Sequence, residues 1–187
     1  PELERYILHL TATLDAQLRQ AVADFDFNGY VRLLTDFANN DLSAFFFDIR
    51  KDSLYCDAPD APKRRAYRTV LDLLFEALVR WLAPVLPFTS EEAWTTRYPA
   101  AEGSVHLLTW PELETSWRNE ALGARWAELR ALRTQVNEAI EPFRRDKVIR
   151  SSLEAEVTVP PAPNADLAEL FIVAKVSPGD ALAVTRT

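Results

Sequence analysis

The sequence is poor in three residue types, with four glycines, one cysteine and no methionine among 187 residues. So little glycine argues against a fold rich in tight turns and hairpins. The single cysteine, Cys56, excludes an intrachain disulfide, and with two histidines it offers too few ligands for a Cys/His zinc site. No apolar run approaches the length of a membrane span, and no basic-then-apolar leader opens the chain. Because no initiator methionine is present, we expect a fragment or a processed piece. Cytosolic origin is the default expectation.

The sequence also lacks the motifs of an enzyme active site. It contains no glycine-rich phosphate loop, no Ser/His/Asp set and no metal-ligand spacing. His9 lies between apolar residues and is expected at the surface or edge of a helix, whereas His106 has no partner to polarise it. Cys56 has no neighbouring base, so an idle thiol explains it better than a nucleophile does. We therefore expect no enzymatic activity from this chain alone.

The charge balance is acidic, with a formal net charge of −7. This argues mildly against a generic nucleic-acid binder, which usually carries a basic surplus, although a local basic stripe can act on an acidic protein. From the sequence runs alone, solvated helix ends are the preferred explanation of such stripes. Two stripes are present: Lys63, Arg64, Arg65 and Arg68, and then Arg144, Arg145, Lys147 and Arg150.

Apolar residues spaced three and four apart predict helices along most of the chain. The main four cover residues 2–24, 28–55, 63–83 and 119–145. The second would be about 40 Å long, which suits an extended bundle. Its weakest point is Asn39–Asp41, because these residues are poor helix formers. Its predicted inward stripe comprises Phe27, Val31, Leu34, Ala38, Leu42, Phe45 and Ile49.

Shorter elements complete the predicted fold. A turn is expected at 24–29, and Thr89–Glu92 forms a potential capping box that opens a short helix. Alternating apolar residues predict a strand over 153–159, followed by a short helix and two further strand candidates. The fold class is therefore mainly α: a helical bundle (1–100), a connector (101–118), and a long helix with a small α/β element (119–187).

Three consecutive phenylalanines, Phe45, Phe46 and Phe47, cannot all face one core. Neighbouring residues of a helix point about 100° apart, so Phe46 or Phe47 must leave the stripe and meet a second helix or a ligand. Cations and a tyrosine follow directly, at Arg50, Lys51 and Tyr55. Aromatic platforms beside cations suit unstacked RNA bases, and helix packing is the equally good alternative.

This segment resembles a stretch in the anticodon-binding domain of isoleucyl-tRNA synthetases, a class I aminoacyl-tRNA synthetase family. Further segments resemble the same family in the same order, and together they cover nearly the whole chain. The matching segments are Asp41–Tyr55, Leu82–Trp94, Ser104–Leu107 with Trp110-Pro111, and Lys147–Ala155. Valyl enzymes share the Pro84–Glu92 pattern, so they are the closest alternative; a helical protein-interaction scaffold is the other.

The resemblance implies a tRNA-binding part of an enzyme that joins isoleucine to its tRNA with ATP and Mg. The family's nucleotide-binding signatures and editing domain are absent from this sequence, so no cofactor or metal is expected here. The implied partners are isoleucine-accepting tRNA and the catalytic domain of the same protein, in a cytoplasmic, monomeric enzyme without membrane contact.

The resemblance also implies specific tRNA contacts, at the far end of the second long helix. Arg50, Lys51 and Tyr55 are the best candidates, with Phe47 and Asp48 next. A pair between Asp48 and Lys51 across one helical turn is an equally good explanation of those two residues. A second group is assigned to the tRNA backbone, with salt pairs preferred as its explanation: Arg144, Arg145, Lys147 and Arg150.

Overall fold

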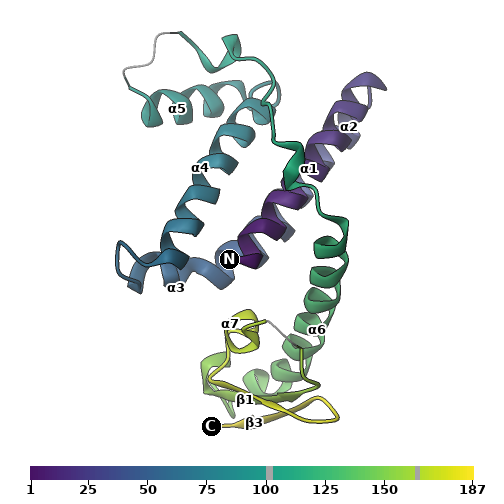
Figure 1. Ribbon diagram of the computed structural model, residues 1–187, viewed down its shortest axis with the longest axis vertical. Coiled ribbons are helices and arrows are strands. Elements are labelled where there is room, and N and C mark those ends of the chain that lie inside the picture. The colour runs from purple at the N-terminus through teal and green to yellow at the C-terminus, as the bar shows by residue number, and fades with distance from the viewer. Residues whose placement is uncertain (100–102, 163–164) are drawn as a thin grey trace. The chain divides into compact units, whose positions relative to one another are not determined.

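The computed structural model describes residues 1–99, 103–162 and 165–187. They form two compact units, Pro1–Gly123 and Ala124–Thr187, which are treated separately below. The first unit is helical, and the second ends in a small sheet (Figure 1). The predicted fold class, mainly α with a small α/β element, is confirmed. The predicted domain boundary at residues 100 and 101 lies outside the described residues.

The first unit opens with two helices, α1 (Glu2–Ala23) and α2 (Phe27–Asp36), that pack against each other. The turn between them is shorter than predicted, because the carboxylate of Asp26 caps α2 by accepting a 2.8 Å hydrogen bond from the backbone N–H of Gly29. A Cβ on Gly29 would collide with that carboxylate, so the glycine permits the cap. The left-handed residue of this turn is Phe25, with φ 56°.

The long helix predicted over 28–55 exists as one continuous helical run. After α2 it continues as a π-helical segment, η1 (Phe37–Phe47), and then as α3 (Asp48–Cys56). The expected weak point, Asn39–Asp41, lies within the π segment, whose hydrogen bonds span one residue more than those of an α-helix.

This change of repeat moves the buried face of the helix. Buried positions advance by four and three residues up to Phe37, and then by five to Leu42. The predicted inward positions Phe27, Val31 and Ala38 are therefore wrong, and all three are exposed. The residues that the run actually buries are Gly29, Tyr30, Leu34, Phe37, Leu42, Phe45, Phe46, Ile49, Arg50 and Ser53.

Two further helices follow, α4 (Pro62–Leu82) and α5 (Pro87–Arg97). Each begins with proline at its first position, where the missing N–H costs no intrahelical bond. The predicted capping box at Thr89–Glu92 is wrong, because α5 starts earlier and has no side-chain cap. Glu91 instead accepts hydrogen bonds from Ser104 Oγ (2.7 Å) and the Val105 N–H (2.9 Å), which hold its pKa below the usual 4.5.

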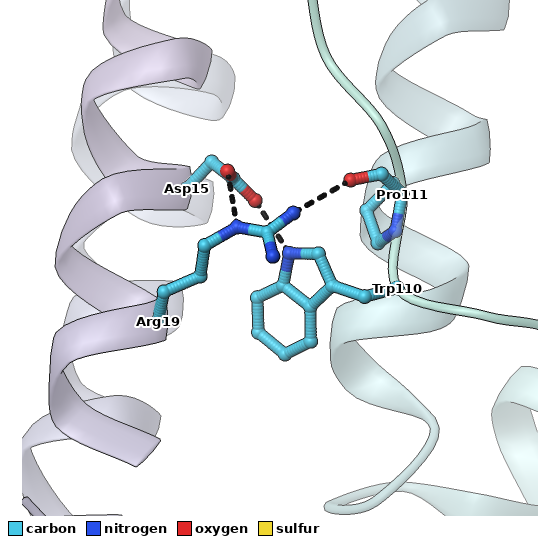
Figure 2. Close-up of polar contacts among 4 residues, drawn as sticks. All are labelled: Asp15, Arg19, Trp110 and Pro111. Carbon is cyan, nitrogen blue, oxygen red and sulfur yellow. Dashed lines mark hydrogen bonds and ion pairs between the residues drawn. The ribbon is translucent and has the colours of Figure 1, made fainter. Parts of the chain in front are cut away.

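The connector is fastened to α1 around Trp110 (Figure 2). Its indole N–H donates a 2.6 Å hydrogen bond to Asp15, whose carboxylate also pairs with Arg19 at 2.8 Å. Arg19 lies over the Trp110 ring, 5.1 Å from its centroid, and donates to the Pro111 carbonyl at 3.1 Å. The described part of the connector is otherwise irregular except for two 3-10 turns, η2 (Val105–Leu107) and η3 (Thr115–Trp117).

His9 receives the end of the connector where α6 (Glu120–Arg145) begins. The ring is 5% exposed, so its expected place at a helix surface is wrong. Its Nδ1 accepts a 3.0 Å hydrogen bond from the Asn119 N–H, and Gly123 lies against the ring where a Cβ would collide with it. His9 is therefore a buried packing residue.

The second unit combines the rest of α6 with η4 (Ser152–Glu154), β1 (Ala155–Val159), α7 (Leu167–Phe171), β2 (Lys175–Pro178) and β3 (Ala183–Arg186). The strand order is β2-β1-β3, with β1 parallel to β2 and antiparallel to β3. Every second residue of β1 is buried, as the alternating sequence predicts.

Candidate nucleic-acid interface

The end of α3 and the start of α4 pack together at one end of the helical unit (Figure 1). Arg64 joins the two helices by donating a 3.2 Å hydrogen bond from Nη1 to the Asp57 carbonyl. The Ser53 hydroxyl donates to the Asp57 carboxylate and stabilises the end of α3. The packing brings α3, which carries Lys51 and Tyr55, against α4, whose first turns carry the basic stripe. We call Lys51, Tyr55, Lys63, Arg65 and Arg68 the α3–α4 surface.

A buried ion pair joins α3 to the start of α1. Arg50 donates to both carboxylate oxygens of Glu4, with Nε–Oε1 at 2.7 Å and Nη2–Oε2 at 3.1 Å. The two side chains are only 5% and 4% exposed. Two parallel bonds fix the planar group more firmly than one, so the pair holds the start of α1 against α3. Arg50 is thus buried inside the bundle.

Two of the three consecutive phenylalanines pack against different neighbouring helices. Phe45 meets Tyr6 of α1 edge-on at 6.2 Å between ring centroids. Phe46 is fully buried and meets Tyr67 of α4 edge-on at 4.9 Å. The surplus aromatic predicted from the helical repeat therefore meets a second helix. Phe47 is half-buried and contacts Phe46, with the ring centroids 5.9 Å apart.

The outer residues of α3 differ in how firmly they are held. Lys51 pairs with Asp48 at 3.0 Å, which is the predicted contact across one turn. Tyr55 is 81% exposed, although its phenol is a large, mostly apolar group. Below it, burial raises the pKa of Tyr67 to about 12, with a smaller contribution from Tyr55. Tyr67 thus stays neutral at physiological pH, and Tyr55 offers an open aromatic face.

Local charge at this end of the bundle is basic, unlike that of the whole chain. Residues 48–68 contain six arginines and lysines and four aspartates, whereas the chain as a whole carries −7. Arg65 and Arg68 are exposed on α4. An exposed aromatic ring with cations around it can stack on an unpaired base and neutralise neighbouring phosphates.

The second predicted group of cations lies in the other unit. Arg144 and Arg145 end α6 and pair with Glu141 (3.5 Å) and Asp146 (3.2 Å). Lys147 and Arg150 are exposed in the turn that follows, where Lys147 has φ 58°. The salt pairs preferred from the sequence are present for the two arginines. All four side chains remain on the surface.

Sequence reasoning missed the two residues that organise the first site, Glu4 and Tyr67. The sequence offered one signal for Glu4, because it is an acid directly after Leu3, the first residue of an apolar stripe. Its partner Arg50 is 46 residues away, and no local pattern indicates such a pairing. Tyr67 was hidden because Ala66 satisfied the predicted helical repeat equally well.

No helix in residues 1–99, 103–162 or 165–187 is long and apolar enough to cross a membrane. Within the same ranges, no three His, Cys, Asp or Glu side chains are grouped so that they could hold a metal ion. Cys56 is exposed and free.

Residues 4–159 match the family described as the anticodon-binding domain of tRNA ligase. The isoleucine–tRNA ligase of Zymomonas mobilis is 56% identical over 193 residues, covering 97% of this chain and 20% of that ligase. The isoleucine–tRNA ligase of Agrobacterium fabrum is 52% identical over 180 residues, covering 96% of this chain and 18% of that protein. The chain thus spans about a fifth of the length of these relatives. The predicted resemblance to isoleucyl-tRNA synthetases is confirmed, and the chain belongs to the family of anticodon-binding domains of tRNA ligases.

Proposed function

We propose that this chain is the anticodon-binding part of a longer isoleucine–tRNA ligase, called the parent ligase below. The observation that carries the proposal is the family match over residues 4–159 together with 56% identity to an isoleucine–tRNA ligase. The parent ligase joins isoleucine to its tRNA with ATP, in the cytoplasm and as a monomer. This chain grips the anticodon stem-loop and leaves the chemistry to the rest of the protein.

The α3–α4 surface supplies the grip. Tyr55 stacks on an unpaired base of the anticodon loop. Its ring is already exposed, so stacking requires no rearrangement of the protein core. Lys51 supplies charge to the loop backbone, and Asp48 aligns Lys51 through their pair. Phe47 supports the surface from below by its contact with Phe46.

Arg50 acts as a positioning residue in this proposal. Two of its guanidinium nitrogens bind the Glu4 carboxylate and its side chain is 5% exposed, so a base could reach it only by disturbing the buried ion pair. By holding α3 against α1, Arg50 sets the place of its neighbour Lys51 and of Tyr55 one turn further on.

The cations of the second unit bind tRNA phosphates without reading bases. Arg144, Arg145, Lys147 and Arg150 are exposed, and phosphate contacts tolerate the weak surface pairs that the two arginines make. This role predicts a contribution to affinity and none to the choice of tRNA.

ATP and Mg are assigned to the remainder of the parent ligase. In this proposal the rest of the protein carries out the chemistry, and this chain contributes tRNA binding alone. An isoleucine-dependent pyrophosphate exchange assay of the chain alone should therefore give the background rate, while the parent ligase is active.

Titration of the parent ligase with tRNA at several salt concentrations tests the proposal. Binding of an isoleucine-accepting transcript should weaken linearly in a plot of log affinity against log salt, because phosphate neutralisation releases counterions. A noncognate transcript should bind more weakly at every salt concentration. Equal binding of both transcripts would contradict specific recognition of the anticodon.

A further inference from the structure

An exposed apolar surface lies where α1 turns into α2. Four side chains form it, and we call them the corner patch: Val22, Phe25, Phe27 and Val31. Phe25 and Phe27 are 79% and 60% exposed, and their rings meet edge-on with centroids 6.1 Å apart. Val22 and Val31 are 42% and 40% exposed. A group of large exposed apolar side chains indicates a contact site, whereas a single exposed apolar residue is common on protein surfaces.

The backbone at Phe25 adds a second observation. The N–H groups of Phe25 and Asp26 donate to the carbonyls of Val22 (3.1 Å) and Ala21 (2.8 Å). This is the Schellman pattern that ends a helix, in which glycine usually takes the left-handed position. Here that position holds Phe25 with φ 56°, a conformation that bulky residues rarely adopt. The turn accepts backbone strain at a residue whose ring faces solvent, so folding of the turn does not explain the phenylalanine.

The helical repeat of α2 gives a third observation. Phe27 and Val31 are four residues apart, so they lie on one face of the helix. The apolar stripe of the sequence predicts that Phe27 and Val31 are buried, yet α2 buries Tyr30 and Leu34 and leaves Phe27 and Val31 exposed. The face is thus apolar in sequence and uncovered in this chain.

Charge around the corner patch argues against an RNA partner. Residues 20–36 contain three acids, Asp24, Asp26 and Asp36, and one base, Arg32. The α1–α2 turn is also at the opposite end of α1 from the α3–α4 surface (Figure 1). The 22 residues of α1 separate them by about 33 Å at 1.5 Å per residue. An apolar centre with an acidic rim suits a protein surface with an apolar centre and basic residues around it.

We infer that the corner patch docks onto another part of the parent ligase, one that presents apolar side chains bordered by lysine or arginine. The chain covers about a fifth of the length of its relatives, so most of the parent is available to cover the patch. This inference rests on the proposed function only in taking the chain as part of a longer ligase. It gives the two ends of α1 different partners: tRNA at the α3–α4 surface and protein at the corner patch.

Hydroxyl-radical footprinting of the parent ligase tests the inference, with reactivities normalised to the free amino acids. Tyr55 is the internal reference, because its exposure (81%) matches that of Phe25 (79%) in this chain. Without tRNA, Phe25 and Phe27 should react at least about fivefold more slowly than Tyr55, as expected for aromatic residues in an interface core. On addition of tRNA, Tyr55 alone should become protected.

Each part of this result has its own meaning. Failure of tRNA to protect Tyr55 would contradict the proposed anticodon contact and leave the corner patch inference standing. Reactivity of Phe25 and Phe27 equal to that of Tyr55 would overturn the inference. Protection that appears only with tRNA, or only as the protein concentration is raised, would also overturn it, because the occupant would then be RNA or a second copy.

The Phe25→Gly variant of the parent ligase separates docking from folding. Glycine removes the ring and suits the left-handed backbone, so the melting temperature of this domain should stay the same or rise. Protection of Phe27 should nevertheless be lost, with its normalised reactivity approaching that of Tyr55. A lower melting temperature with unchanged protection of Phe27 would show that Phe25 serves the fold, and would overturn the inference.

Discussion

The two ends of α1 are built on opposite principles. The α3–α4 end has a buried ion pair between Glu4 and Arg50, together with exposed cations and an exposed tyrosine. At the α1–α2 end, the turn is strained, its surface is apolar and its charged residues are mostly acidic. One helix thus carries a surface suited to RNA and a surface suited to protein at its two ends.

The net charge of the chain does not describe the charge at either end. A chain with a charge of −7 is a poor candidate for RNA binding on average. Bases outnumber acids in residues 48–68, whereas acids outnumber bases around the α1–α2 turn, so the local charge at the two ends differs. If the two ends act separately, substitutions at the α3–α4 end should weaken tRNA binding, and a substitution at the α1–α2 end should leave it unchanged.

The largest effect is expected for Arg50→Ala, which leaves the Glu4 carboxylate buried without its partner. Unfolding free energy should fall by about 3–5 kcal/mol, and tRNA binding should weaken with it. Urea denaturation measures the first effect. The matched control is the double variant Glu4→Leu/Arg50→Met, which removes both charges and should cost far less; an equal loss in both variants would rule out the unpaired charge as the cause.

Tyr55→Ala should weaken tRNA binding with little change in stability. Loss of one stacked base costs about 1–3 kcal/mol, or roughly a 5- to 150-fold rise in Kd. The exposed side chain contributes less than about 0.5 kcal/mol to folding. Tyr55→Phe keeps the ring and should retain most of the affinity. If Tyr55→Phe binds as poorly as Tyr55→Ala, a hydrogen bond of the phenol is responsible and stacking is not.

Phe25→Gly should act in the opposite direction on stability. Relief of the left-handed backbone strain should stabilise the chain by about 1 kcal/mol. Thermal unfolding of the 187-residue chain provides the measurement. Binding of tRNA should be unchanged, because the corner patch is far from the α3–α4 surface; a tRNA defect in this variant would break the division between the two ends.

Lys51→Ala should have the smallest effect, seen mainly in the salt dependence. Its exposed pair with Asp48 contributes at most about 1 kcal/mol to stability. Loss of one phosphate contact should reduce the salt slope of tRNA binding by about one. Titrations between low and moderate salt measure the slope, and Lys51→Arg should restore it. An unchanged slope would contradict a phosphate contact of Lys51 and would leave its pair with Asp48 as its only role.

Much of the fold could be predicted from the sequence because its helices carry strong periodic stripes. The bounds of α1, α4 and α6 agree with the predicted helices to within a residue or two. The prediction was wrong at two places, where a second structural feature overrode the local sequence pattern. Proline at position 87 started α5 before the capping box could, and the π-helical segment moved the buried face of the second long helix.

The candidate site was only partly predictable, because its organisation depends on contacts between distant segments. Tyr55 and Lys51 could be singled out from their local pattern. The burial of Arg50 could not, since Glu4 lies in another helix and pairs with it only after the bundle forms. The basic stripe of α4 became part of the surface for the same reason, through the packing of α3 against α4.

The most direct test compares two activities of the parent ligase carrying Tyr55→Ala. Isoleucine-dependent pyrophosphate exchange does not require tRNA contact at the α3–α4 surface, whereas charging of tRNA does. The account predicts that kcat/KM for charging falls roughly 5- to 150-fold, as the loss of one stacked base implies, while pyrophosphate exchange is unchanged. An equal fall in both activities, or no fall in charging, would contradict the claim that this surface holds the anticodon stem-loop.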